Sequence, residues 1–322
     1  MKIELKYLRL LRGKKNLLAF SYGGDSRALF ECLLRQNISF DLALINYKTR
    51  KQSDLEEKKA KELASKFNKQ IFTKTAPKFK NNFESKAREF RYAFFKELCE
   101  KKDYENVLLA HQLNDNFEWF LMQFSKGAGF LELSPMQDIV KKDNFLLIRP
   151  FLNFSKNEIL AFLKQNNIFY FEDESNENEK FKRNYIRKHF SNEFINNFER
   201  GVKKSFEYIN KDLSLLNTEI LEFKGILYCA INESVIARAV KRFGIVMSAK
   251  QRKESKKDCV ISAKLGICYA FNKAFIFNFE NALKMPKSFK EECRINKIPK
   301  LLRPYLFNHN VNIKEFLARV VV

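Results

Sequence analysis

The sequence predicts an α/β fold: a doubly wound parallel sheet, a helical linker and a smaller C-terminal α+β domain. Three short, almost wholly apolar runs, at 16–20, 41–46 and 106–110, have the pattern of strands that are buried on both faces. Stretches with helical period lie between them, and strand–helix–strand alternation favours parallel pairing. The chain of 322 residues is long enough for two domains.

The helices that follow these strands are expected over 26–36, 53–67 and 83–100. A fourth strand is expected at 145–151. Ser155 should then cap a helix over 155–165, because Glu158 stands three residues later and completes a capping box.

The second half of the chain changes character twice. Residues 173–182 are polar and have no period, so they predict a loop. A helical region should follow from about 184 to 223, with a break near Gly201. Beyond it we expect short mixed elements, including a hairpin at 264–279. We therefore expect a catalytic domain over 1–215 and a C-terminal domain over 216–322.

The charge of the chain indicates a polyanionic partner. The 60 Lys and Arg exceed the 38 Asp and Glu, which leaves a net charge of +22. Nucleic acid is the commonest partner for such a surface. A lysine-rich composition with no ligand behind it would give the same count.

The six cysteines form no CxxC pair and match no zinc-finger spacing. Free thiols of this kind are typical of a reduced, cytoplasmic protein. Since no run of about 18 apolar residues occurs, we expect no membrane span.

The segment Ser21–Ser26 follows the first strand and opens the first helix. Gly23 and Gly24 allow a tight turn, and the N–H groups at the start of a helix can cradle an anion. Asp25 could hold Mg²⁺. An ordinary turn capped by Asp or Ser would have the same composition.

A second polar group follows the strand at 106–110. If a helix begins there, His111, Asp115 and Glu118 lie at i, i+4 and i+7 on one face. One imidazole and two carboxylates could bind a metal or an ammonium group, or could move a proton. The alternative is a solvated helix face with acids near the positive end of the dipole.

These segments resemble the tRNA(Ile)-lysidine synthetases, a family of N-type ATP pyrophosphatases with the PP-loop, adenine nucleotide alpha hydrolase-like fold. Residues 21–26 are similar to the S-G-G-x-D-S loop, with Tyr22 in place of a glycine. Residues 111–119 resemble H-H-x-x-D-x-x-E-T, with Gln112 and Trp119 at the second and last positions. Other segments that fit the family in order are 84–92 (E-x-x-A-R-x-x-R-Y), 173–176 with 183–187 (D-x-S-N…R-N-x-I-R), Asn46 with Arg50, and Arg149 with Pro150.

The resemblance implies a reaction. ATP adenylates the C2 oxygen of the wobble cytidine in the isoleucine tRNA with a CAU anticodon, and pyrophosphate leaves. The ε-amino group of free L-lysine then attacks C2 and expels AMP, which leaves lysidine. The partners implied are ATP, Mg²⁺, lysine and this tRNA, and the sequence leaves a homodimer open.

The resemblance also assigns roles. Residues expected to bind the nucleotide are Ser21, Tyr22, Gly23, Gly24, Asp25, Ser26 and His111, with Asp25 also near Mg²⁺. Residues expected to act in catalysis are Asp25, Arg91, Asp115, Glu118 and Arg187. Either acid, Asp115 or Glu118, could bind the lysine ammonium or accept its proton.

Two further expectations concern Tyr22, which replaces a glycine of the family pattern, and the C-terminal domain. The Tyr22 side chain should crowd the phosphate cradle, so that Tyr22→Gly is tolerated and can improve ATP binding. The alternative is that Tyr22 points away from the cradle and packs on a neighbour. The C-terminal domain should hold the tRNA body, and deleting 225–322 should weaken tRNA binding while the ATP site survives. Its basic residues are Arg238, Lys241, Arg242, Lys250, Arg252, Lys253, Lys256 and Lys257.

Rival functions remain. A tRNA thiolase of the same superfamily is the nearest, although the chain lacks the paired cysteines of the persulfide and iron–sulfur types. Amidotransferase members usually carry a glutaminase unit, for which there is little room. A degenerate, non-catalytic RNA-binding protein would explain Tyr22, Gln112 and Trp119.

Overall fold

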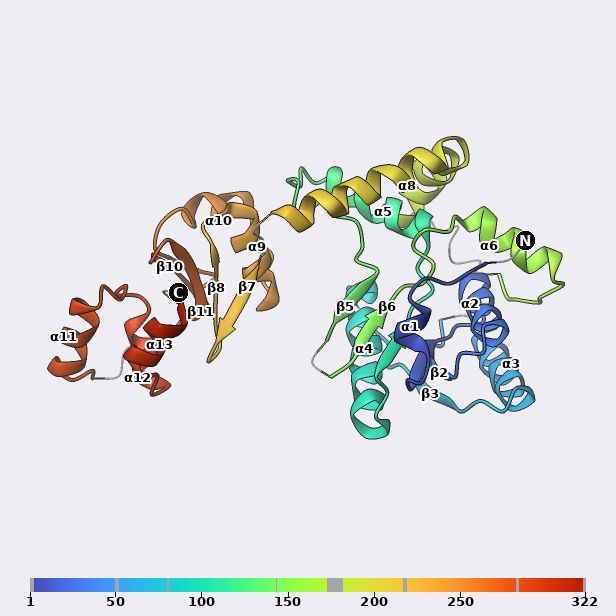
Figure 1. Ribbon diagram of the computed structural model, residues 1–322, viewed down its shortest axis with the longest axis horizontal. Helices are drawn as coiled ribbons and strands as arrows, with labels where there is room; N and C mark the ends of the chain where they lie inside the picture. Colours follow the sequence, from blue (N-terminus) through green and yellow to red (C-terminus); the bar gives the residue numbers. More distant parts are fainter. Residues whose placement is uncertain are drawn as a thin grey trace. The chain divides into compact units, whose positions relative to one another are not determined.

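The computed structural model describes residues 3–49, 52–79, 81–142, 144–172, 182–216, 219–281 and 284–320. The chain forms two compact units, each with its own sheet (Figure 1). The first consists of Met1–Gly127 and Pro135–Ile209, and the second of Ala128–Ser134 and Asn210–Val322. A short segment from the middle of the chain therefore belongs to the C-terminal unit.

The first unit contains a six-stranded sheet with the order β3-β2-β1-β4-β6-β5. Its strands are β1 (Asn16–Ala19), β2 (Asp41–Asn46), β3 (Ile71–Thr75), β4 (Asn106–Leu108), β5 (Ile139–Lys141) and β6 (Leu146–Ile148). Five strands run parallel, and β5 pairs antiparallel to β6 at one edge. The order of the strands reverses between β1 and β4, and ligands of open α/β sheets bind at the carboxyl ends beside such a reversal.

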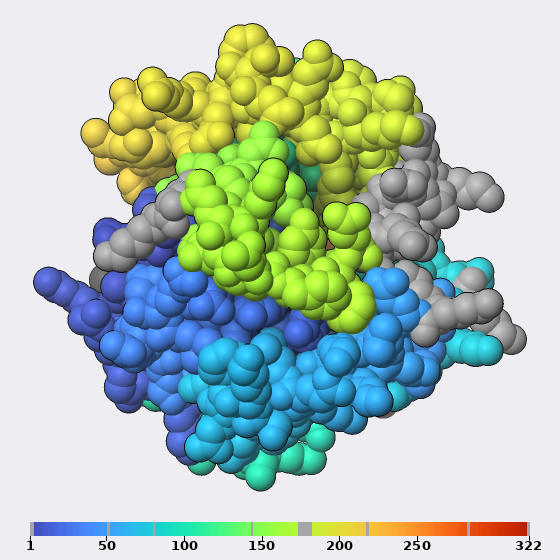
Figure 2. All heavy atoms as spheres, turned by 90° about the vertical axis from the view of Figure 1, so that its right-hand side faces the viewer, coloured from blue at the N-terminus to red at the C-terminus, as the bar shows by residue number. Residues whose placement is uncertain are grey.

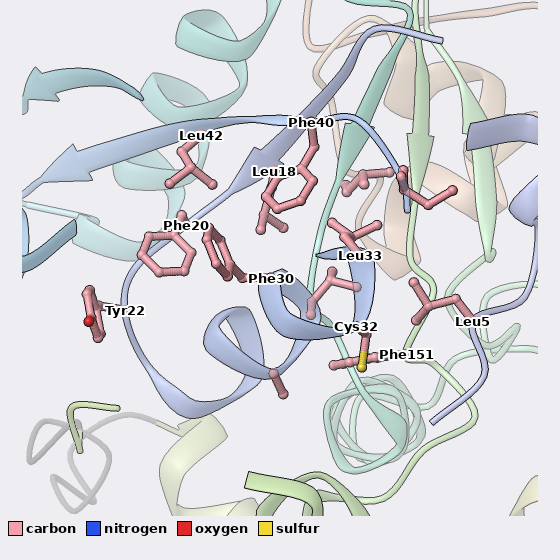
Figure 3. Packing of buried hydrophobic residues seen from close by; sticks show 14 of the residues in the cluster. Leu5, Leu18, Phe20, Tyr22, Phe30, Cys32, Leu33, Phe40, Leu42 and Phe151 are labelled. Carbon is pink, nitrogen blue, oxygen red and sulfur yellow. The ribbon is translucent and has the colours of Figure 1, made fainter. Parts of the chain in front are cut away.

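Helices cover both faces of this sheet, because neighbouring strand residues point to opposite sides. Leu18 and Leu108 face a core formed with α2 (Gly24–Arg35), α3 (Ser53–Lys66) and α6 (Lys156–Gln165). Leu17 and Val107 face α4 (Phe83–Lys102) on the other side. Figure 3 shows the first core, in which Phe30 and Leu33 of α2 pack beneath Leu18. A short helix, α1 (Leu8–Leu11), precedes β1.

The α/β class and the first elements are confirmed. The capping box of α6 is confirmed as well: Ser155 accepts from the N–H of Glu158, and the Glu158 carboxylate accepts from the N–H of Ser155. The sequence pattern does not predict two of the strands, β3 and β5. The residues of β3 are only partly buried, and β5 has three residues, so neither has the apolar run that indicates the other strands.

The single helical region expected over 184–223 is wrong in detail. It consists of α7 (Lys182–Ile186), a π-helical turn η2 (Arg187–Ser191) and α8 (Asn192–Leu215). The break expected near Gly201 is confirmed, and the non-helical residue within α8 is Phe198. Residues Ile220–Phe223 form a strand, β7. Figure 2 shows α6 between α2 below and α8 above, and an ion pair of 2.9 Å from Lys203 to Glu158 joins α8 to α6.

The second unit is an antiparallel sheet with the order β7-β8-β11-β10-β9. Its further strands are β8 (Ile226–Ala230), β9 (Cys259–Ile261), β10 (Leu265–Ala270) and β11 (Lys273–Asn278). The hairpin expected at 264–279 is confirmed as β10 and β11. One core of this unit contains residues of α9 (Glu233–Arg242) and Met247. Helix α10 (Ala249–Glu254) begins just after Met247 in the sequence. The other core packs against α11 (Lys287–Ile295), α12 (Arg303–Asn308) and α13 (Ile313–Val320).

Candidate nucleotide site

A cavity of about 360 Å³ lies at the carboxyl ends of β1, β2 and β4. This volume is in the range of small-molecule sites, about 300–1,000 Å³. Its lining includes six of the residues expected to act there, namely Ser21, Asp25, Ser26, Arg91, His111 and Asp115. The structure thus brings together residues from three chain segments at the reversal of strand order.

The loop from Ser21 to Ser26 is held by its own hydroxyl groups. Ser26 Oγ donates to the Gly23 carbonyl at 3.0 Å and lies 3.2 Å from Ser21 Oγ. The N–H of Gly23 points to Ser21 Oγ at 3.3 Å. Helix α2 begins at Gly24, and Gly23 at the N-cap has no side chain to cap it. The N–H groups of the first turn and the helix dipole can therefore serve an anion.

The carboxylate of Asp25 forms an ion pair with Lys156, at 2.7 Å between Oδ1 and Nζ. Burial raises the pKa of Asp25, while Lys156 opposes the rise. Lys156 is the first residue of α6, and its backbone N–H donates to Asn114 Oδ1 at 3.1 Å. Sequence reasoning missed Lys156 as a site residue. The capping box formed by Ser155 and Glu158 was the available signal, because it identifies Lys156 as the first residue of the helix.

His111 lies just before α5 (Leu113–Phe124), whose N-cap is Gln112. The expected placement of His111 on the same helix face as Asp115 and Glu118 is therefore wrong. Arg149 Nε donates to His111 Nδ1 at 3.2 Å. Burial, with Arg149 nearby, lowers the pKa of His111 to about 4 despite the opposing charge of Asp115. His111 is thus neutral at pH 7 with its proton on Nε2, which can donate a hydrogen bond.

Two arginines from the helical turns that follow α6 hold the acids of α5. Arg183 contacts Asp115 Oδ1 at 2.6 Å and Glu118 Oε2 at 2.8 Å. Arg187 contacts both oxygens of Glu118, at 2.7 and 3.0 Å. Burial alone would raise the pKa of Asp115, but Arg183, His111 and Arg187 outweigh it and keep the pKa below its usual value. The positive charges of Arg183 and Arg187 therefore balance the negative charges of the two carboxylates.

The two acids differ in access. Asp115 lines the cavity, and its other oxygen accepts from the N–H of Gln112. Glu118 is fully buried and is outside the lining. Gln112, which departs from the family pattern, caps α5 by accepting from the N–H of Asn114. This departure has a structural role.

Arg91 belongs to α4, which packs on the other face of the sheet from α2, and its side chain also lines the cavity. Its Nε donates to the Tyr47 hydroxyl at 3.3 Å, and both residues line the cavity. Arg187 is absent from that lining and contacts Glu118 instead.

The expectation that Tyr22 crowds the cradle is wrong. Tyr22 has the left-handed backbone that favours glycine, with φ of 62°. Its side chain is only 7% exposed and lies in the core (Figure 3). The ring packs edge-on against Phe20 and Phe171, at centroid distances of 5.4 and 5.3 Å. Of this residue only the backbone belongs to the loop.

The residues present fit a magnesium ion brought by a nucleotide. Mg²⁺ commonly takes one or two carboxylates and completes its shell with phosphate oxygens and water. Asp25 provides one carboxylate in the cavity. Among the residues that the structure describes, no cluster of three His, Cys, Asp or Glu could hold a metal by itself.

Two expected features lie outside the described residues: the acidic stretch 173–176, and Arg50 after β2. In the C-terminal basic cluster, Arg252 is bound to Glu132 at 2.9 Å. Most of the remaining cations in it are exposed. In the described part of the chain, no helix combines the length and apolarity needed to cross a membrane.

Comparison with known proteins agrees with this geometry. Residues 2–194 match the model of the PP-loop domain family. A tRNA(Ile)-lysidine synthase from Campylobacter jejuni (strain RM1221) is 57% identical over 318 residues, which cover 98% of this chain and 99% of that protein. The protein of the same name from Helicobacter pylori (strain J99) is 38% identical over 310 residues, covering 94% and 91%.

Among solved structures, a U34-tRNA thiolase from Methanococcus maripaludis superposes with a TM-score of 0.55 at 14% identity, covering 67% of this chain and 76% of that one. That similarity concerns the fold. The likeness to the lysidine synthases, in contrast, extends over almost the whole chain. The chain therefore belongs to the tRNA(Ile)-lysidine synthase family, whose PP-loop enzymes use ATP to modify tRNA.

Proposed function

We propose that this protein joins free L-lysine to C2 of the wobble cytidine in the isoleucine tRNA with a CAU anticodon. The observation that carries the proposal is the cavity, which the loop after β1 and Asp115 of α5, the helix after β4, both line. The names of the full-length relatives support the same activity. The reaction takes place in the cytoplasm, where lysine, ATP and tRNA meet.

In the first step the C2 oxygen attacks the α-phosphorus of ATP and pyrophosphate leaves. The N–H groups that begin α2, with Ser21 and Ser26, bind the pyrophosphate. Asp25 would hold Mg²⁺, and the ion would supply positive charge to balance that of the phosphates. Lys156, now paired with Asp25, turns to the phosphate oxygens when the nucleotide binds.

Arg91 and His111 complete this set. Arg91 is a cation in the cavity wall and stabilises negative charge that develops at the α-phosphate. Neutral His111 donates from Nε2 to the nucleotide or to the base.

In the second step the lysine amine attacks C2, the C2–O bond breaks, and AMP leaves. Asp115 lines the cavity, attracts the ammonium of the incoming lysine and accepts the proton that the ammonium must lose before its nitrogen attacks. Glu118 is better placed to position Arg183 and Arg187 than to take a proton, because it is fully buried between them. We therefore assign Glu118 and Arg187 positioning roles.

The position of the cavity and of the exposed cations assigns a role to each of the two units. The first unit carries the chemistry, and the second unit, with its exposed cations, binds the body of the tRNA.

The test is AMP release by the purified protein with ATP, lysine and the CAU isoleucine tRNA. Release should require all three, and should stop when the wobble cytidine is replaced by guanosine. A thiolase would ignore lysine, and a non-catalytic RNA-binding protein would bind the tRNA without releasing AMP.

A further inference from the structure

A row of exposed aromatic rings follows the helical turns next to the cavity. We call it the aromatic stripe, and it consists of Tyr185, His189, Phe190, Phe194 and Phe198. Phe190 and Phe198 are 52% and 58% exposed. Large aromatic side chains in water are costly, so a series of them indicates a surface that becomes covered.

The stripe begins beside the arginines that hold the acids of α5. Tyr185 stands between Arg183 and Arg187 in sequence, and these two contact Asp115, which lines the cavity. An occupant of the stripe would therefore lie close to the reacting centre.

The rings are arranged in groups. Tyr185 lies 4.5 Å from the His189 ring and 6.1 Å from Phe190, measured between centroids. The π-helical turn Arg187–Ser191 carries the latter two, and such turns are frequent at functional sites. Further along, Phe194 lies 5.0 Å from Phe198 and stacks on Phe117 of α5, also at 5.0 Å. The second group is thus anchored to the helix that carries Asp115.

The charge around the stripe selects the occupant. The segment from 182 to 204 contains seven Lys or Arg and two Glu. A second copy of the chain would bring two cationic segments together, which is unfavourable. An RNA loop, in contrast, carries unpaired bases that stack on aromatic rings and phosphates that pair with cations.

We propose that the aromatic stripe binds unpaired bases of the tRNA anticodon loop by stacking, and so holds the loop open while the wobble cytidine enters the cavity. The inference rests on the proposed function for the identity of the RNA. A base that reacts inside a pocket must leave its stack, and stacking its neighbours on protein offsets that cost.

The test uses the full-length protein and an RNA hairpin with the sequence of the anticodon stem and loop. 2-Aminopurine replaces the adenine next to the wobble cytidine and reports stacking by its fluorescence. The variants are Phe190→Leu, Phe198→Leu and their combination, which remove rings and leave the charge unchanged. The control is Tyr208→Leu on α8, the helix that also carries Phe198, because the ammonium of Lys204 already lies over the Tyr208 ring, 4.8 Å from its centroid.

Each single variant should weaken hairpin binding by about 5- to 150-fold if it removes one stacked base. The 2-aminopurine signal should move toward that of the free hairpin. The slope of affinity against salt should stay as in the wild type, because every cation that pairs with phosphate is still present. Affinity for ATP should not change, since neither ring lines the cavity.

Wild-type hairpin affinity and fluorescence in the double variant would overturn the inference. So would a wild-type dimer that the variants convert to monomer with no change in RNA binding, because a second copy would then cover the stripe. A wild-type protein that stacks the hairpin but releases no AMP would refute the proposed function and leave the stripe standing. A wild type that releases AMP with the whole tRNA but binds no hairpin would overturn the inference and leave the proposed function standing.

Discussion

Tyr22 shows how one residue can satisfy a backbone and a core at once. Its positive φ is the conformation for which the family uses glycine, while its ring fills a gap among Phe20, Phe169 and Phe171. The strain of a non-glycine residue there costs about 1–2 kcal/mol. Burial of the ring more than offsets it.

We expect Tyr22→Gly to lower the free energy of unfolding by about 2–4 kcal/mol, because removing the ring costs more than the backbone gains. ATP binding should not improve. Urea denaturation and ATP titration measure the two effects, with Tyr22→Phe as the control that keeps the ring. Tighter ATP binding by the glycine variant at unchanged stability would restore the crowding hypothesis.

Lys156 forms an ion pair with the Asp25 carboxylate in the phosphate loop. We expect Lys156→Met to raise the dissociation constant for ATP about 10- to 100-fold, since methionine cannot make the charge-assisted hydrogen bond to phosphate. Lys164→Met, an exposed lysine of the same helix, is the matched control. Equal affinity in both variants would remove Lys156 from the site.

His111 should titrate far below the usual range of a histidine, because burial lowers its pKa. Its pKa in the folded protein is about 4, against 6.5 in the unfolded chain. The unfolded state therefore binds more protons between these values, so this contribution to stability is present above pH 6.5 and is lost as the pH falls toward 4. NMR titration of the three histidines measures the pKa directly. In His111→Gln the acid-side loss of stability should be smaller, and an inflection near pH 6.5 for His111 would contradict its burial.

At the scale of the element, α7 and the π-helical turn η2 depend on one buried acid. Glu118 is fully buried and contacts both Arg183 and Arg187. Removing one partner of a buried ion pair leaves the other charges uncompensated.

Glu118→Gln should therefore destabilise the protein by about 3 kcal/mol and loosen residues 182–191. Hydrogen exchange should speed up in these residues and stay unchanged in α2. The control is Glu193→Gln, an exposed acid at the start of α8. Unchanged exchange in 182–191 would mean that other interactions hold these turns.

Elements with a strong local signal could be predicted from the sequence. The largely buried strands β1, β2 and β4 have uninterrupted apolar runs, and α6 has its capping box. In contrast, the residues of β7 have an apolar spacing that suits a helix as well, and only pairing with β8 decides it. The same holds for the site: the motifs identify Asp25 and Asp115, but the neighbours that set their charge, Lys156 and Arg183, come from distant segments.

At the scale of the whole molecule, the exposed cations of the second unit should add to the salt dependence of tRNA binding. Replacing Lys253, Lys256 and Lys257 by glutamine should weaken binding and lower the log–log salt slope by up to about 2–3, roughly one for each phosphate that the protein no longer neutralises. Filter binding at several salt concentrations measures this. ATP affinity serves as the internal control, and an unchanged slope would mean that these lysines face solvent in the complex.

This substitution is a better test than deleting 225–322. Leu131 is buried in a core of the second unit, and Glu132 contacts Ser234 and Arg252 there. A truncated chain would keep the segment Ala128–Ser134 without these partners. Weakened function in the deletion could then reflect damage to the fold rather than the absence of a tRNA-binding surface.

The segment Ala128–Ser134 also has a consequence for folding during synthesis, because its partners in the second unit are made later. Glu132 leaves the ribosome 102 residues before Ser234, its partner in the second unit. At about 5–20 residues per second, Glu132 waits on the order of 5–20 seconds until Ser234 has been made. During that interval the first unit must fold while the segment Ala128–Ser134, which belongs to the second unit, stays exposed. Slowing translation between residues 135 and 234 would lengthen this exposure, so chaperone capture of the nascent chain should increase.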